Sequence, residues 1–442
     1  MTHATSKSIH GTWHGTIQFG NAPIAIVLRI DTSGPEISGL SDFPQHYRAD
    51  LPLRDLSFEQ DTLRFTTRSF GDYAGTLAPD GQRIEGCFTQ EDKSHALILH
   101  PGPPPVESSE RPQTPKPPFT YRAQTVTVEH LAGTLTVPED QPVRAVVLLV
   151  TGSGAMDRDE TVFGHKPFWV LADFLSRNGY AVLRLDDRGV GESGGDRATL
   201  TLEDETGDMA MALDLLRARD EFRGLPIGVI GHSVGGLIAT TLAARRSDVA
   251  FVITMGTPGM DFGDAFAERE CADLEKAGAS PDTVEKHGNF TRALYAWLGR
   301  HAETPMDSER FAALAAQFGA DDTAAPRNNQ EWIGRFNTPW FRSAARWQPA
   351  DALKGLSAPL LAINGSLDVQ SIAASNLKVI AETLANAGHT DFETLELAGL
   401  NHLFQTCSTG AVYEYPVIEE TFAPLALHAL RDWLHRRFKP TG

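Results

Sequence analysis

Cysteine is scarce in this chain of 442 residues, and the three that occur, Cys87, Cys271 and Cys407, have no C-x-x-C spacing. An odd number of scattered cysteines fits reduced thiols better than a disulfide framework or a zinc site. We expect all three to be packing residues. This cysteine usage favours a protein of a reducing compartment.

Long apolar runs are also missing. The longest, residues 145–150, is far shorter than the roughly 20 residues that a helix needs to cross a bilayer, and residues 1–10 lack the apolar stretch of a secretory signal. Basic residues are outnumbered 39 to 57, which gives a formal charge of −18. The missing signal segment makes the cytoplasm the expected location. Because the negative charge repels phosphate backbones and anionic lipids, we expect the protein to bind neither nucleic acid nor membranes.

Proline, in contrast, is concentrated in one segment. Residues 101–118 hold 8 prolines in 18 positions, a composition that favours an extended linker over a helix or a central strand. Before this linker, apolar residues of 24–30 alternate as in a half-buried strand. We therefore predict an all-β domain over 1–100 and a second domain over 119–442.

The pattern changes after the linker. Short runs that are apolar on both faces alternate with longer amphipathic segments, which is typical of a parallel sheet covered by helices. The predicted strands are 145–150, 180–185, 227–230, 249–255 and 359–363, and the predicted helices are 168–177, 202–219 and 377–387. These elements indicate a doubly wound α/β domain. Residues 258–350, with four tryptophans, are expected to form an inserted helical subdomain that lines an apolar pocket or is purely structural.

The motif with the clearest chemistry is Gly231-His232-Ser233-Val234-Gly235, which follows an apolar strand and precedes a helical pattern. A serine on a sharp turn between strand and helix projects its hydroxyl away from the backbone. The Val234 amide at the start of the helix can then stabilise an oxyanion. An ordinary turn is the alternative, but the flanking strand and helix favour a nucleophile.

A nucleophilic serine needs a histidine base and a carboxylate that orients it. Asp368 follows the predicted strand 359–363, and His402 follows a further alternating run, so the order is serine, acid, histidine. Both lie beyond the ends of strands, where open parallel sheets bind ligands. Asp261 is a less favoured candidate for the acid. Two other histidines are less favoured as the base: His232 is interpreted as a turn or packing residue, and His389 as solvated.

The second oxyanion donor is expected in the turn Thr151-Gly152-Ser153-Gly154, and we assign it to the amide of Ser153. The charged run 157–160 is interpreted as a solvated or structural loop, with binding of a charged substrate group as the alternative. Residues 189–194 fit G-x-G-x-x-G, but no second strand ending in an acid follows about 20 residues on. A dinucleotide site is therefore disfavoured.

Residues 187–193, Asp-Arg-Gly-Val-Gly-Glu-Ser, resemble the D-R-G-x-G-x-S turn of α/β-hydrolases, and GHSVGG resembles their nucleophile elbow. The strings TGSGAMDRDE, HKPF, LRLDDRGVGESGG and LNHLFQ are similar to those of bacterial carboxylesterases with an extra N-terminal β-domain. The chain departs from many of them at Thr151, where they have histidine. The resemblance implies an α/β-hydrolase fold, a cap formed by the inserted segment, and ester hydrolysis by Ser233, Asp368 and His402.

Residues and resemblance together favour a serine carboxylesterase that cleaves short- to medium-chain esters through an acyl-enzyme, with no metal or organic cofactor. Its partner is a small-molecule ester, and a homo-oligomer is left open. A peptidase or an acyltransferase could use the same triad. Two alternatives come from other functional classes. One is a dinucleotide-dependent oxidoreductase, and the other is a non-catalytic module whose N-terminal domain binds a carbohydrate or another partner.

Overall fold

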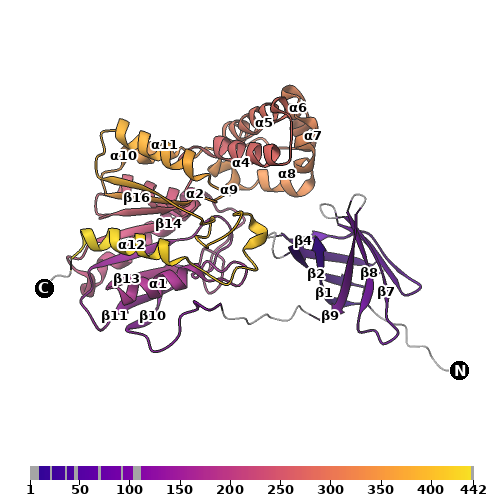
Figure 1. Cartoon of the computed structure of the whole chain (residues 1–442), viewed down its shortest axis with the longest axis horizontal. Helices are drawn as coiled ribbons and strands as arrows, with labels where there is room; N and C mark the ends of the chain where they lie inside the picture. The colour runs from indigo at the N-terminus through magenta and orange to yellow at the C-terminus, as the bar shows by residue number, and fades with distance from the viewer. Residues whose placement is uncertain are drawn as a thin grey trace. The chain divides into compact units, whose positions relative to one another are not determined.

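The computed structural model describes residues 9–19, 22–34, 37–43, 48–67, 71–90, 93–102 and 111–439. Part of the predicted linker, residues 103–110, lies outside the described residues. The chain divides into two compact units, residues 1–109 with 413–417 and residues 110–412 with 418–442. The first is built from strands, and the second from strands and helices (Figure 1).

Nine antiparallel strands form the first unit, so the prediction of an all-β N-terminal domain is confirmed. They lie in the order β4-β3-β2-β1-β9-β8-β7-β6-β5. Their bounds are β1 Gly11–Phe19, β2 Ala22–Asp31, β3 Ser38–Phe43, β4 Arg48–Pro52, β5 Arg54–Glu59, β6 Thr62–Thr67, β7 Gly71–Leu77, β8 Ile84–Gln90 and β9 Lys93–Pro101.

Alternation of side chains along these strands builds a core of large residues. Trp13, Phe65 and Tyr73 are all buried in it, and the Tyr73 hydroxyl lies 3.2 Å from a backbone carbonyl oxygen of β8. Phe88 of β8 is buried, whereas its neighbour Cys87 is exposed. Because successive residues of a strand point to opposite faces, the prediction that Cys87 packs is wrong.

The second unit contains an eight-stranded sheet in the order β10-β11-β13-β12-β14-β15-β16-β17. β10 and β11 form an antiparallel hairpin, β11 is antiparallel to β13, and the strands from β13 to β17 are parallel. The bounds are β10 Tyr121–Val128, β11 Leu131–Pro138, β12 Ala145–Val150, β13 Tyr180–Leu185, β14 Ile227–His232, β15 Val252–Met255, β16 Leu360–Gly365 and β17 Phe392–Leu397.

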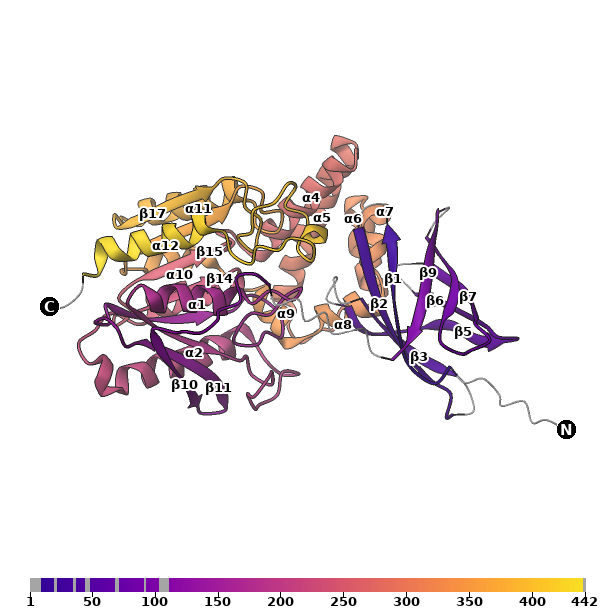
Figure 2. The ribbon, with the colours of Figure 1, turned by 60° about the horizontal axis from the view of Figure 1, so that its bottom comes forward.

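Helices cover both faces of this sheet (Figures 1 and 2). The fully buried strand β12 sends Val146 and Leu148 into one core and Val147 and Leu149 into the other. α2 (Leu202–Ala218), α3 (Val234–Arg245), α10 (Pro349–Gly355) and α11 (Ala373–Asn386) pack on the first face, and α1 (Pro167–Arg177) and α12 (Pro424–Arg437) on the second. The doubly wound α/β-hydrolase fold is therefore confirmed.

A group of helices is inserted between β15 and β16, and α4 and α5 lie beyond one end of the sheet (Figure 2). Phe290, Phe311 and Phe336 are fully buried among them. The helices are α4 Phe262–Lys276, α5 Pro281–Arg300, α6 Ser308–Phe318, α7 Asp321–Ala324, α8 Gln330–Phe336 and α9 Pro339–Ala344.

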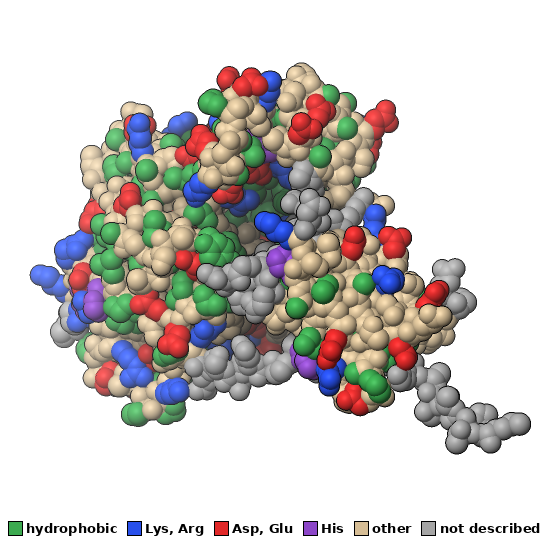
Figure 3. Space-filling model, turned by 45° about the vertical axis from the view of Figure 1, so that its right-hand side comes forward, with side chains coloured by type: hydrophobic (Ala, Val, Ile, Leu, Met, Phe, Trp, Pro, Cys, Tyr) green, Lys and Arg blue, Asp and Glu red, His purple; other side chains and the backbone are tan. Residues whose placement is uncertain are grey.

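The surface carries charges of both signs. On the face shown in Figure 3, acidic and basic side chains are interspersed rather than segregated. Within the described ranges, none of the helices has the length and apolar content that a bilayer crossing requires.

Candidate active site

Ser233 lies on a sharp turn between β14 and α3. Its backbone has a φ of 53° and a ψ of −121°, a strained combination for a residue with a side chain. Its N–H donates to the carbonyl oxygen of Met255 on β15 at 2.7 Å. Ser233 is partly exposed, whereas His232 and Val234 on either side are buried. The turn thus presents the serine at the carboxyl end of the parallel strands.

Glycines are required on both sides of Ser233 because backbone segments approach closely there. A β-carbon at Gly231 would lie 2.2 Å from the carbonyl oxygen of Gly235, and one at Gly235 would lie 2.2 Å from that of Val150. Both distances are far below van der Waals contact. Close packing of the turn against α3 and β12 therefore explains the G-x-S-x-G spacing.

Asp368 and His402, both buried, form a hydrogen-bonded pair. Oδ2 of Asp368 lies 2.7 Å from Nδ1 of His402. Oδ1 accepts the backbone N–H groups of Gln370 and Ser371 at 2.8 and 2.9 Å, and the side chain of Asn364 donates to Oδ2 at 3.3 Å. Four donors therefore fix the carboxylate in one orientation.

The loop that carries His402 is held by its own side chains. Asn401 Oδ1 accepts two backbone N–H groups of the loop at 3.0 Å, and its Nδ2 donates to the Gln405 side chain at 2.9 Å. Gly256, after β15, passes beside the pair, because a β-carbon there would lie 3.1 Å from Nδ1 of His402. Since Nδ1 faces the carboxylate of Asp368, Nε2 is the nitrogen available to act as a base.

The loop after β12 passes next to the serine. A β-carbon at Gly152 would lie 3.3 Å from the β-carbon of Ser233. The Gly152 N–H donates to Glu160 at 2.7 Å, so it does not face a substrate. Ser153 is exposed, and its N–H has no acceptor in the described part of the chain. Val234 begins α3, where first-turn N–H groups have no partner within the helix. The amides of Ser153 and Val234 are therefore available donors.

Asp187, two residues after the end of β13, anchors this loop. Its Oδ1 accepts the Thr151 hydroxyl at 2.8 Å and its Oδ2 accepts the Met156 N–H at 3.0 Å. Burial raises the pKa of Asp187 to about 6, although these hydrogen bonds and Arg197 oppose the shift. Thr151, where the sequence departs from histidine, therefore has a hydrogen-bonding role within the loop.

Sequence reasoning missed Glu160. This residue is 3% exposed, and its Oε1 lies 2.8 Å from Nδ1 of His232. The prediction that residues 157–160 are solvated is therefore wrong at Glu160. The alternative within that prediction, a structural role for the run, agrees with the ion pairs that Arg158 and Asp159 form. The signal in the sequence that could have pointed to Glu160 is His232, next to the serine, because a buried histidine needs polar partners.

The rival residues have other roles. The side chain of Asp261 caps α4 by accepting the N–H of Asp264 at 3.0 Å, so it is not in the position of the acid. His389 is half-buried and stacks on Phe392 with a ring-centroid distance of 6.3 Å. The prediction that His389 is solvated is therefore wrong for its Nε2, which is buried.

The described residues include no arrangement of three or more His, Cys, Asp or Glu side chains suited to a metal ion. The glycine run 189–194 closes a turn, in which the Gly189 N–H donates to the carbonyl oxygen of Gly194 at 2.9 Å. The next helix, α2, starts only at Leu202. The run therefore does not open a helix, as a dinucleotide fingerprint would.

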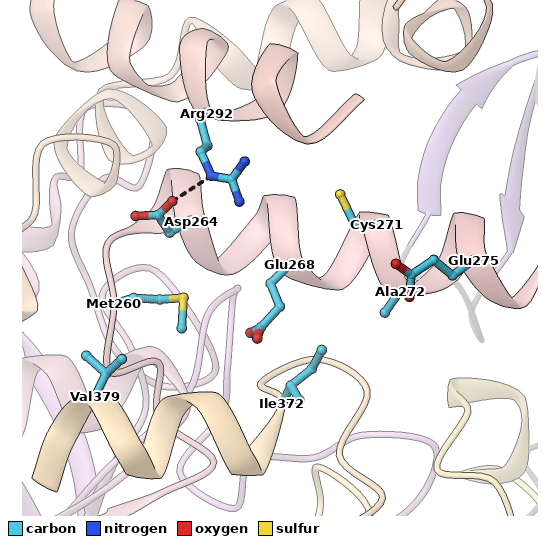
Figure 4. A pocket seen from close by; sticks show the side chains of 9 residues that line it. All are labelled: Met260, Asp264, Glu268, Cys271, Ala272, Glu275, Arg292, Ile372 and Val379. Atoms are coloured by element: carbon cyan, nitrogen blue, oxygen red, sulfur yellow. Dashed lines mark hydrogen bonds and ion pairs between the residues drawn. The ribbon is translucent and has the colours of Figure 1, made fainter. Parts of the chain in front are cut away.

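A cavity of about 540 Å³ lies between α4 and the start of α11. Figure 4 shows Glu268 projecting from α4 toward Ile372, with Arg292 bonded to Asp264 on the opposite side. None of the four tryptophans of the inserted helices and none of the predicted site residues lines this cavity. The tryptophans are instead partly buried against the helical core.

Parts of this chain are similar in sequence to known proteins. Residues 164–263 match the family described as serine aminopeptidase, S33. Esterase EstD of Thermotoga maritima is 27% identical over 287 residues, which amount to 65% of this chain and 61% of that protein. The chain has an α/β-hydrolase fold and an N-terminal β-domain. It spans less than two thirds of the length of this curated relative.

Several solved structures are also similar. An esterase of Pyrococcus furiosus has 17% identity and a TM-score of 0.44, and the match covers 72% of this chain and 92% of that one. Est1E from Butyrivibrio proteoclasticus with ferulic acid bound has 14% identity and a TM-score of 0.43, with coverage of 71% and 99%. Proline iminopeptidase of Mycobacterium smegmatis has 16% identity and a TM-score of 0.43, with coverage of 71% and 98%.

Proposed function

We propose that this protein is a serine carboxylesterase that hydrolyses short- to medium-chain carboxylic esters through an acyl-enzyme on Ser233. The observation that carries the proposal is the buried pair of Asp368 and His402, which lies beyond the same end of the sheet as the strained turn of Ser233. Similarity to an esterase supports an ester as the substrate.

In the first half of the reaction, the Ser233 hydroxyl oxygen attacks the ester carbonyl while Nε2 of His402 takes the hydroxyl proton. Asp368 keeps Nδ1 protonated and stabilises the imidazolium. The bond to the alcohol oxygen then breaks, His402 protonates the leaving alcohol, and the acyl group stays on Ser233. In the second half, His402 removes a proton from water, and the resulting hydroxide attacks the acyl carbonyl. His402 then returns the proton to the Ser233 oxygen as its bond to the acyl group breaks and the acid is released.

Negative charge develops on the carbonyl oxygen in both halves of the reaction. The N–H groups of Val234 and Ser153 are the proposed donors to this oxyanion. Each preorganised donor of this kind lowers the barrier by about 3 kcal/mol. Val234 adds the favourable field of the α3 N-terminus.

The chain-length part of the proposal rests on the inserted helices. Trp297, Trp332, Trp340 and Trp347 are partly buried against the core. Their packing leaves only part of the aromatic surface of this segment open to an acyl chain, which favours short to medium chains.

An aminopeptidase that uses the same triad is the second candidate. The family match over residues 164–263, which includes Ser233, favours it. Cleavage of aminoacyl p-nitroanilides at rates comparable to p-nitrophenyl esters would support this alternative over the esterase.

The test is hydrolysis of p-nitrophenyl esters from acetyl to long acyl chains. Ser233→Ala and His402→Ala should abolish turnover, and Asp368→Asn should lower kcat by about four orders of magnitude, because it leaves the histidine in the wrong tautomer. Asp261→Asn is the matched control and should keep the wild-type rate. Full activity of Ser233→Ala, or no activity of the wild type on any ester, would refute the proposal.

A further inference from the structure

Glu160 and His232 form a buried pair that the proposed chemistry does not use. Glu160 is 3% exposed and His232 is 6% exposed. Oε1 of Glu160 lies 2.8 Å from Nδ1 of His232. Glu160 lies in the loop after β12, and His232 is the last residue of β14.

Both ring nitrogens of His232 have partners. Nε2 lies 3.0 Å from the backbone carbonyl oxygen of His402, which can only accept a hydrogen bond, so Nε2 carries a proton. Oε1 of Glu160 already accepts the Gly152 N–H, an arrangement that suits a carboxylate facing a protonated Nδ1. Burial lowers the pKa of His232, but the charge and hydrogen bond of Glu160 and the His402 carbonyl outweigh burial, and the net direction is upward.

This pair touches three of the loops that form the proposed active site. Glu160 holds the Gly152 N–H, directly before the proposed oxyanion donor Ser153. His232 directly precedes Ser233 in the turn. His232 also holds the main chain of His402, and the two imidazole centroids are 4.8 Å apart.

We propose that Glu160 and His232 are positioning residues that hold the oxyanion loop and the histidine loop in register with Ser233. The proposal rests on the proposed esterase function. The orientation of the peptide group that carries the Gly152 N–H influences the orientation of the following peptide group, which carries the Ser153 N–H. Without Glu160 as the acceptor for Gly152, the Ser153 amide can therefore rotate away from the substrate oxygen. Losing the bond from His232 frees the His402 backbone. Shifts of about 1 Å in such groups can cost about 100-fold in rate.

The pair also has an electrostatic effect on the base. The titratable groups that face His232 are Glu160, His402 and Asp368, and Glu160 in turn faces Asp187. A positive His232 disfavours a second positive charge on His402. Removing the positive charge of His232 should therefore move the acidic limb of the kcat/KM profile to higher pH.

The experiment compares Glu160→Gln, His232→Gln and the double variant on a p-nitrophenyl ester of the chain length that the wild type prefers. Each single variant should lower kcat about 10- to 100-fold with KM within about threefold, because alignment rather than binding is lost. The double variant should be no slower than the slower single variant, since the two residues act as one unit. His232→Gln should also shift the acidic limb upward by about 0.5 to 1 pH unit.

Glu192→Gln is the control. It removes an exposed carboxylate that pairs with Arg158 of the same loop and should leave kcat within about threefold and the acidic limb in place. If Glu160→Gln does not fold, as judged by circular dichroism, His232→Gln decides the question alone. Wild-type kcat and an unmoved limb in the folded variants would overturn the positioning role but leave the esterase proposal intact. An inactive wild type would overturn both.

Discussion

Oδ2 of Asp368 lies 2.7 Å from Nδ1 of His402, and Oδ1 of the same carboxylate accepts two backbone N–H groups from residues 370 and 371. The group that orients the proposed base is therefore oriented by the backbone of its own turn. Alignment of the site depends on short loops after β12, β14, β15, β16 and β17, so substitutions that shift these loops should lower the rate without removing any reacting group.

Gly256 tests this dependence. Its φ is +60°, and a β-carbon there would lie 3.1 Å from Nδ1 of His402 and 3.3 Å from Oδ2 of Asp368. Gly256→Ala should lower kcat about 10- to 100-fold, because the histidine must move. Gly224→Ala is the control for backbone strain alone, since Gly224 also has positive φ but no neighbour within 4 Å of the added carbon. Equal kcat values for the two variants in steady-state assays would contradict the prediction.

Ser153 tests the second oxyanion donor. The proposal uses its backbone N–H and not its side chain, which is exposed. Ser153→Ala should therefore keep kcat within about twofold, whereas Ser153→Pro, which removes the N–H, should lower it about 100-fold. Steady-state kinetics on one ester measures both, and a fast proline variant would exclude this amide from the oxyanion hole.

Glu205 of α2 gives a prediction of stability against pH. Burial raises its pKa to about 7, although the hydrogen bond from the Trp340 indole lowers it. A raised carboxyl pKa means that the folded state holds the proton more tightly, so stability falls as pH rises from about 4.5 to about 7. Glu205→Gln keeps an acceptor for Trp340 and should raise the free energy of unfolding by about 1 to 2 kcal/mol at pH 8, with no gain at pH 4. Denaturant unfolding at both pH values checks this, and a gain at pH 4 would contradict it.

Glu270 of α4 gives the opposite dependence. Burial raises its pKa, but hydrogen bonds from His287 and Thr291 and the charge of Arg327 outweigh burial and lower the pKa below its usual value. Ionised Glu270 therefore contributes to the stability of the fold above its unfolded-state pKa of about 4.5. This contribution is lost as the pH falls through the lower pKa of the folded state. Glu270→Gln should destabilise the protein by about 3 kcal/mol at pH 7, because it leaves Arg327 buried without its carboxylate. Thermal unfolding should show that the difference shrinks in acid, and a constant difference would contradict this account.

The central strands β12 to β16 could be predicted because each is buried on both faces and has a largely apolar sequence. Residues 145–150 and 180–185 coincide with β12 and β13. The hairpin of β10 and β11 was missed, since β10 lies at the edge of the sheet and alternates between buried and less buried positions. The residues of β10 therefore do not form the uninterrupted apolar run that marks the central strands.

The candidate site was predictable only as far as local context reaches. Ser233 stands in a strand-turn-helix motif, and Asp368 and His402 follow strands, so their positions can be read along the chain. The partnership of Glu160 with His232 joins residues 72 positions apart, and a charged run such as 157–160 gives no local sign that one of its members is buried. Contacts of this kind arise only when the loops meet in three dimensions.

The most direct test of the central claim is peptide mass spectrometry of the wild-type protein after reaction with a p-nitrophenyl alkylphosphonate, which traps a serine nucleophile as a stable adduct. The account predicts one phosphonyl group per chain, located on Ser233, no adduct in Ser233→Ala, and much slower labelling in His402→Ala. A stoichiometric adduct on another residue, or ester hydrolysis that continues while Ser233 stays unlabelled, would contradict it.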